Sequence, residues 1–179
     1  MSKVVVISGS PSGTSRLDGL LKHTIAYLEQ SRMQTTVIQV RDLPAEDLLH
    51  AKFDSPAIVR ANEAIAEADA VLVCTPVYKA SYTGILKAYI DLLPQKGFEN
   101  KVMLPIAMGG TLAHHLCIDY ALKPLMIALG ATRILTGMFV VDSQVRWNED
   151  GVLEMQQEVA DRHTKTLEQL VSAVNQRQG

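Results

Sequence analysis

The sequence alternates short, continuously apolar runs with segments whose apolar residues recur at helical spacing, and this alternation constrains the fold more than any other feature. The apolar runs predict strands at residues 3–8, 35–40, 68–76, 102–108 and 131–140. Helical spacing predicts helices at residues 15–28, 55–68, 83–93, 113–129 and 154–175. Strands that are apolar throughout are buried on both faces, so they belong to a parallel sheet covered by helices.

This order of elements fits one domain that spans residues 1–179. Five β/α units of this size favour a doubly wound, flavodoxin-like α/β fold: a five-stranded parallel sheet of order 2-1-3-4-5 with helices on both faces. Ligands of such sheets bind beyond the carboxyl ends of the strands, where the order reverses between strands 1 and 3. The rule points to three loops, at residues 8–16, 75–83 and 108–114.

Charge and composition exclude several classes of protein. The net charge of -2, from 17 basic and 19 acidic residues, gives no electrostatic basis for binding nucleic acid or an anionic membrane. No apolar run approaches the roughly 20 residues of a membrane-spanning helix, and none resembles a signal segment, so we expect a cytoplasmic protein. Cys74 and Cys117 lie in apolar surroundings without CxxC spacing, which predicts two reduced, buried thiols.

The first of the three loops, GSPSGTSR at residues 9–16, is rich in hydroxyl groups and leads into a helix. It lacks the GK[ST] ending of loops that bind nucleoside triphosphates and the GxGxxG spacing of loops that bind dinucleotides. Free backbone N–H groups and the helix dipole favour an anion at such a turn. We interpret the loop as a site for one terminal phosphate; the alternative is a turn that only caps the helix.

The other two loops offer a slot for a flat ring. The segment at 75–83 places Pro76, Tyr78 and Tyr82 beyond the third strand, although tyrosines in turns also commonly do no more than cover the edge of a core. The segment at 108–114 contains two adjacent glycines, which allow close approach of a ligand to the backbone.

Neither a metal nor a catalytic triad is expected at this edge. His115 and Asp119 supply only two of the three or four ligands that metal sites need. The serines of the first loop do not form the GxSxG motif of a nucleophile elbow. The chemistry is therefore expected to come from a cofactor. One phosphate site beside a ring slot describes FMN, and hydride transfer to FMN needs mainly orientation from the protein.

The same segments carry a family resemblance over residues 1–145. GSPSGTSR, DLLHAKFDSPA, TPVYKASYTGILK, LPIAMGGTLAHHLCIDYALKPLM and DSQV resemble the NADPH-dependent FMN reductases, most closely the reductase components of two-component alkanesulfonate monooxygenase systems. The resemblance implies a homo-oligomer, a dimer or tetramer, that oxidises NAD(P)H to reduce free FMN. It also implies that the reduced flavin passes to a separate FMNH2-dependent monooxygenase in sulfur acquisition.

The resemblance implies three groups of FMN-binding residues and no catalytic acid or base. The phosphate would be held by Ser10, Ser12, Ser15 and Arg16. The ring would be lined by Pro76, Val77, Tyr78 and Lys79, and its far edge by Gly109, Gly110, Thr111 and His114. Ser12 stands where many relatives carry arginine, so Arg16 is expected to supply the positive charge.

Pro124 interrupts the helix predicted at 113–129. It cannot donate to the carbonyl of Tyr120, so the helix is expected to bend or bulge there. In relatives that use flavin as a substrate, a tyrosine at this place lies in a π-bulge near a subunit interface, and the resemblance makes Tyr120 a possible flavin-release element. The alternative is a plain proline kink in which Tyr120 only packs.

Two other functions stay open at this point. One is a flavodoxin-type electron carrier, which the weak net charge disfavours because flavodoxins are strongly acidic. The other is a flavoprotein with permanently bound FMN that reduces quinones or azo compounds. The preference for NADPH over NADH is also open, with Arg16, Lys79 and Arg133 as candidates for binding the 2′-phosphate.

Overall fold

The computed structural model describes residues 1–176. Its main sheet is parallel with order β2-β1-β3-β4-β5, as predicted, and β6 also pairs with β4. The strands are β1 (Lys3–Ser8), β2 (Gln34–Gln39), β3 (Ala70–Pro76), β4 (Val102–Gly109), β5 (Arg133–Ile134) and β6 (Met138–Val141). The predicted strands at 3–8, 35–40, 68–76 and 102–108 are therefore confirmed to within two residues. Their burial is confirmed for β1, β3 and β4, whereas in the edge strand β2 only Ile38 is buried.

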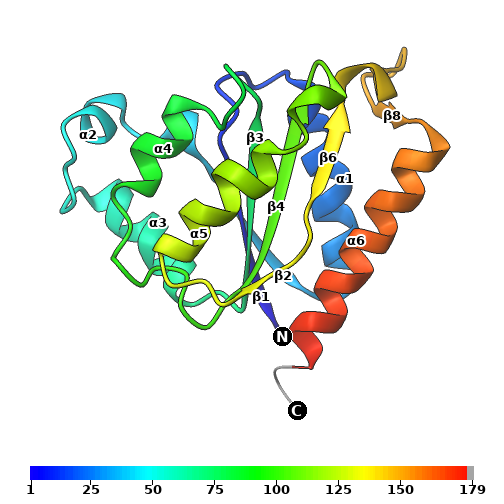
Figure 1. Cartoon of the computed structure of the whole chain (residues 1–179). Helices are drawn as coiled ribbons and strands as arrows, with labels where there is room; N and C mark the ends of the chain where they lie inside the picture. Colours follow the sequence, from blue (N-terminus) through cyan, green and yellow to red (C-terminus); the bar gives the residue numbers. More distant parts are fainter. Residues whose placement is uncertain (177–179) are drawn as a thin grey trace.

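Helices cover both faces of this sheet (Figure 1). One face carries α1 (Arg16–Gln30) and α6 (Gln157–Asn175), and the other carries α3 (Pro56–Ala66), α4 (Gly84–Ile90) and α5 (Lys123–Ala128). Successive residues of β1 point to opposite faces: Val4 and Val6 pack with α1 and α6, whereas Val5 and Ile7 pack on the other side. A short helix, α2 (Ala45–Leu49), and the 3-10 turn η1 (Val40–Asp42) follow β2.

The strand predicted at 131–140 is divided into β5 and β6, which pair with the beginning and the end of β4. Pro105 of β4 lies opposite the gap and has no N–H to donate. Gly137, at φ 90°, passes so close to Pro105 that a Cβ atom would lie 2.7 Å from its carbonyl oxygen. The proline therefore interrupts the pairing, and only glycine fits beside it.

Two predicted helices also differ from the structure. The segment 113–129 is not one helix but a 3-10 turn η2 (Leu112–His114), a π-helix η3 (Ile118–Leu122) and α5. The bulge expected before Pro124 is thus observed, and Tyr120 lies within it. The last helix begins at Gln157 rather than 154, because β7 (Val145–Trp147) and β8 (Leu153–Met155) form a hairpin that the sequence reading missed. This hairpin packs against α1, where a Cβ atom on Gly19 would lie 2.7 Å from Trp147.

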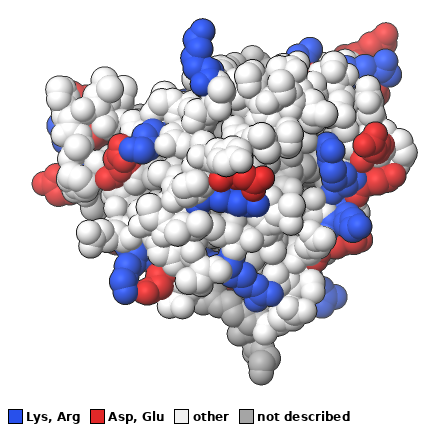
Figure 2. Space-filling model, viewed as in Figure 1, with Lys and Arg blue, Asp and Glu red and all other residues white. Residues whose placement is uncertain are grey.

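Charges are mixed on the surface. The face shown in Figure 2 carries basic and acidic side chains interspersed, without a broad area of one sign. Among residues 1–176, no helix is long and apolar enough to cross a bilayer. Both cysteines are free and buried, as expected.

A buried histidine joins α1 to α6. His163 Nε2 lies 2.8 Å from Thr24 Oγ1, and this hydroxyl donates to the Leu20 carbonyl, so the imidazole donates to the threonine. Burial lowers the pKa of His163 to about 4, and the nearby His23 adds to the effect. The folded protein thus holds His163 neutral.

Stability should fall as the pH falls through the window set by His163. Between pH 6.5 and about 4 the unfolded chain binds a proton at this residue that the folded chain excludes. The linkage lowers the free energy of unfolding by about 3 kcal/mol across this window. Urea unfolding of wild type and His163→Gln at several pH values measures this. In His163→Gln, the free energy of unfolding should depend much less on pH in this window. His50→Gln, at an exposed position, should retain the pH dependence of wild type. Equal pH dependence in all three proteins would contradict the assignment to His163.

Candidate functional site

The three predicted loops lie together at the carboxyl edge of the sheet and are tied by short hydrogen bonds. Gly9 N–H donates to the Cys74 carbonyl at 2.8 Å, and Val77 N–H donates to the Met108 carbonyl at 2.7 Å. Thr83 Oγ1 donates to the Gly9 carbonyl at 2.7 Å. The bonds join the ends of β1, β3 and β4, so the loops form one rigid rim.

Close packing at Gly9 explains why the first loop begins with glycine. A Cβ atom there would lie 2.7 Å from the Leu86 Cβ atom of α4. The same Thr83 hydroxyl that binds the Gly9 carbonyl also caps α4 by accepting from Leu86 N–H at 3.3 Å. The helix that follows the second loop is thereby fixed against the first loop.

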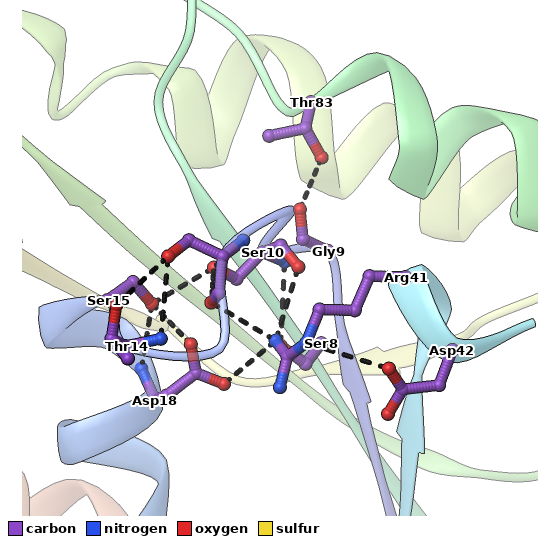
Figure 3. A network of polar contacts seen from close by, with 10 residues as sticks. Ser8, Gly9, Ser10, Thr14, Ser15, Asp18, Arg41, Asp42 and Thr83 are labelled. Carbon is purple, nitrogen blue, oxygen red and sulfur yellow. Dashed lines mark hydrogen bonds and ion pairs between the residues drawn. The ribbon is translucent and has the colours of Figure 1, made fainter.

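Inside the first loop, the serine hydroxyls bind one another and the start of α1 (Figure 3). Ser10 Oγ lies 2.9 Å from Ser15 Oγ and 3.0 Å from the Ser12 carbonyl oxygen. Ser15 caps α1 by accepting from Asp18 N–H at 3.1 Å, and its hydroxyl donates to the Asp18 carboxylate. Such a cap stabilises a helix by about 1 kcal/mol. The buried Ser10 therefore supports the loop from below.

The loop leaves a set of backbone donors without acceptors. Within residues 1–176, the N–H groups of Gly13, Ser15, Arg16 and Leu17 make no hydrogen bond. They surround the positive end of a 15-residue helix. Free N–H groups and the helix dipole together form an anion site.

A cleft of about 210 Å³ lies between the three loops. Its walls are Ser15, Arg16, Leu17, Pro76, Val77, Tyr78, Met108, Gly109, Gly110 and Asp142. Gly109 is needed for this shape, since a Cβ atom there would lie 3.2 Å from Phe139 Cζ and 3.3 Å from Val77 Cβ. Gly109 and Gly110 thus leave part of the wall without side chains, which lets a flat ligand approach the backbone there.

The structure brings seven of the predicted ligands into this cleft: Ser15, Arg16, Pro76, Val77, Tyr78, Gly109 and Gly110. The other five lie around it rather than in its wall. Ser10 is buried under the loop and Ser12 is exposed on it. Thr111 caps η2 by accepting from Ala113 N–H at 3.3 Å, and His114 lies half-buried in that turn.

Lys79 lies in a tight, strained turn at the edge of the cleft. Lys79 and Ala80 have φ angles of 51° and 64°, and the turn is closed by two hydrogen bonds between Tyr78 and Ser81. Residues other than glycine, asparagine and aspartate rarely adopt this conformation, so the turn is held by its surroundings. It presents Tyr78, whose side chain is half exposed, beside the cleft.

Of the three candidates for the 2′-phosphate of NADPH, Arg133 is misplaced. It lies on β5, which pairs with the amino end of β4, and it donates to Gln176 at 3.1 Å. It lines a separate hollow between β5 and α6. Arg16 and Lys79 remain near the cleft.

Sequence reasoning missed Arg41, Thr83 and Asp142. Arg41 follows β2 and reaches the first loop, Thr83 joins the first two loops, and Asp142 follows β6 and lines the cleft. Two of them carried a signal in the sequence. Thr83 comes directly before the helix α4, and Asp142 comes directly after the strand β6. Nothing in the local sequence of Arg41 marks it, because its contacts are about 30 residues away.

The two cysteines do not provide a reactive thiol. Burial strongly raises the pKa of the Cys74 thiol, and burial together with Asp119 raises that of Cys117 to about 11. Both thiols therefore stay protonated and unreactive. Among the described residues, no group of histidine, cysteine and carboxylate side chains could hold a metal ion.

These features fit FMN. The free N–H groups at α1 suit a phosphate dianion, and the glycine-lined wall suits a planar ring beside Tyr78. The two parts of the site are adjacent, because Ser15 and Arg16 belong to the wall of the cleft as well as to the loop.

Comparison with known proteins agrees with this reading. Residues 2–146 match the family model of NADPH-dependent FMN reductases. An FMN reductase (NADPH) of Pseudomonas putida is 50% identical over 146 residues, which cover 82% of this chain and 74% of that protein. One from Escherichia coli is 46% identical over 143 residues, 80% of this chain and 75% of that protein.

A solved structure extends the similarity to the whole fold. The apo form of an NADH:FMN oxidoreductase superposes with a TM-score of 0.87 and 34% identity, covering 97% of this chain and 90% of that one. Sequence similarity and fold similarity therefore point to the same family. This chain belongs to the NADPH-dependent FMN reductase family.

Proposed function

We propose that this chain transfers hydride from NADPH to FMN and then releases the reduced FMN. The observation that carries the proposal is the junction of an anion site and a ring slot at the end of β1. The free N–H groups of Gly13, Ser15, Arg16 and Leu17 adjoin a cleft walled by Pro76, Val77 and Gly109. The identity to FMN reductases supports the same reaction.

The residues of the site bind and orient the reactants. The N–H groups at α1 would hold the phosphate, and the backbone at 76–78 and 109–110 would hold the ring. FMN supplies the chemistry when bound, by accepting a hydride. Hydride transfer to a flavin needs mainly orientation, so the protein is expected to contribute proximity and orientation rather than acid or base catalysis.

The other functions are less well supported. A flavodoxin-type electron carrier would be strongly acidic, whereas this chain has a net charge of -2. A reductase of quinones or azo compounds would retain its FMN. The π-helix at Ile118–Leu122 favours an exchangeable flavin instead, in line with the resemblance to relatives that use flavin as a substrate.

The proposal also covers the protein that uses the reduced FMN, the oligomeric state and the cellular location. Released reduced FMN needs a consumer, and an FMNH2-dependent monooxygenase that acts on sulfonates is the proposed one. A homo-oligomer is expected, with Leu116, Tyr120 and Ile127 as exposed apolar residues around η3 and α5. A cytoplasmic location accords with the two free, buried thiols.

Purified protein tests the reaction directly. It should be colourless and oxidise NADPH only when FMN is added, because the flavin is a substrate. The measurement is the absorbance of NADPH with and without added FMN, under low oxygen to retain reduced flavin. A yellow protein that reduces a quinone without added FMN would favour the retained-flavin alternative.

We propose further that Tyr120 keeps FMN exchangeable. It lies within the π-helix, and the residue is 78% exposed on the surface expected to contact another subunit. Pro124 cannot donate to its carbonyl, so the backbone there departs from regular α-helix. A π-bulge is rare and is often found at functional sites.

Replacing Tyr120 by alanine should convert loosely bound FMN into flavin that copurifies with the protein. The visible absorbance of the purified variant, after extensive dialysis, measures this. Ile127→Ala is the matched control, because Ile127 is also an exposed apolar residue and lies in α5, directly after the π-helix. A Tyr120→Ala protein that purifies colourless and turns over normally would show that Tyr120 only packs.

A further inference from the structure

Arg41 contacts the first loop from the β2 side of β1, whereas the second loop lies on the β3 side. It lies in η1, directly after β2, and its guanidinium contacts three groups of the loop and of α1 (Figure 3). Arg41 Nη1 lies 3.3 Å from the Ser10 carbonyl oxygen, 3.2 Å from the Ser12 carbonyl oxygen and 3.0 Å from Asp18 Oδ1. One guanidinium nitrogen therefore joins the backbone at Ser10 and Ser12 to the first turn of α1.

These contacts set the direction of the loop's backbone. Because a trans peptide places its C=O and N–H on opposite sides, drawing the Ser12 carbonyl toward Arg41 turns the Gly13 N–H away from it. This N–H is one of the four free donors of the anion site. Arg41 is not part of the cleft wall, so it acts on a ligand through the loop.

The charge of Arg41 also removes an electrostatic conflict. Asp18 lies in the first turn of α1 with its side chain only 8% exposed, and an unpaired carboxylate there would repel a phosphate at the same helix end. The ion pair with Arg41, whose side chain is 20% exposed, neutralises it. A second carboxylate, Asp42, lies 3.8 Å from Arg41 Nε. Without Arg41, the carboxylate of Asp18 would lose its ion-pair partner.

We propose that Arg41 is a positioning residue for the phosphate of FMN, and that it makes the site prefer a phosphorylated flavin over riboflavin. The proposal rests on the proposed function of the cleft. It assigns to Arg41 the cationic role for which the sequence offered only Arg16. The two arginines differ in kind: Arg16 lines the cleft, whereas Arg41 orders the donors and cancels the charge of Asp18.

The test compares flavins with and without a phosphate. Dissociation constants of FMN and riboflavin are measured by quenching of flavin fluorescence for wild type, Arg41→Gln and Arg41→Lys, alongside kcat/KM for each flavin. Arg41→Gln should weaken FMN binding about tenfold, as loss of a charge-assisted contact does. Riboflavin binding should change less than about twofold, well below that loss.

Arg41→Lys and one further variant, Arg60→Gln, separate positioning from folding. Arg41→Lys keeps a positive charge, but its side chain is shorter and cannot place an ammonium where Nη1 contacts Ser10, Ser12 and Asp18. Its affinity for FMN should therefore lie between wild type and Arg41→Gln, with riboflavin again unchanged. It also provides the comparison if Arg41→Gln does not fold. Arg60→Gln removes the same charge from an exposed position on α3 and should leave both flavins unaffected.

Three results would overturn the proposal. Equal weakening of FMN and riboflavin in either Arg41 variant would mean that Arg41 only maintains the fold. Unchanged FMN binding in the folded Arg41→Gln protein would mean that the loop does not need it. Equal loss in Arg60→Gln would mean that the effect comes from net charge. A wild-type protein that binds riboflavin as tightly as FMN would instead refute the proposed phosphate site itself.

Discussion

The hydrogen bond from Thr83 to the Gly9 carbonyl is the contact on which the site depends. It joins the loop after β1 to the helix after β3 at the point where the strand order reverses. Gly9 makes the bond possible, because a side chain there would collide with Leu86. With these two loops fixed, α1 must direct its free N–H groups toward the cleft that Pro76 and Val77 border. In the proposed function, this arrangement of the two loops would bind FMN and orient its ring.

Much of the fold could be predicted from the sequence, because apolar runs in β1, β3 and β4 leave no other arrangement than a sheet buried on both faces. The bulge before Pro124 was also predictable, since it follows from a missing N–H. The break between β5 and β6 was not: it arises from Pro105 on a neighbouring strand, and local periodicity carries no signal of it. The β7–β8 hairpin was missed because its strands are only three residues long.

The site divides in the same way. The loops themselves were predictable, because the topology places the ends of β1, β3 and β4 at one edge. The role of each residue within the loops could not be predicted. Ser10 points into the loop rather than toward a ligand, and Arg41 approaches from another strand. Such long-range contacts depend on the twist and spacing of the sheet, which the sequence of a single loop does not record.

In the proposed site, the phosphate of FMN binds the free N–H groups at the start of α1. The most direct measurement is the shift of backbone amide resonances in ¹⁵N-labelled protein on titration with FMN and, separately, with riboflavin. We expect the amide resonances of Gly13, Ser15, Arg16 and Leu17 to shift strongly with FMN and little with riboflavin. The amide resonances at 76–78 and 109–110 should shift with both flavins. Equal shifts at residues 13–17 with both flavins, or shifts confined to the hollow between β5 and α6, would contradict this assignment.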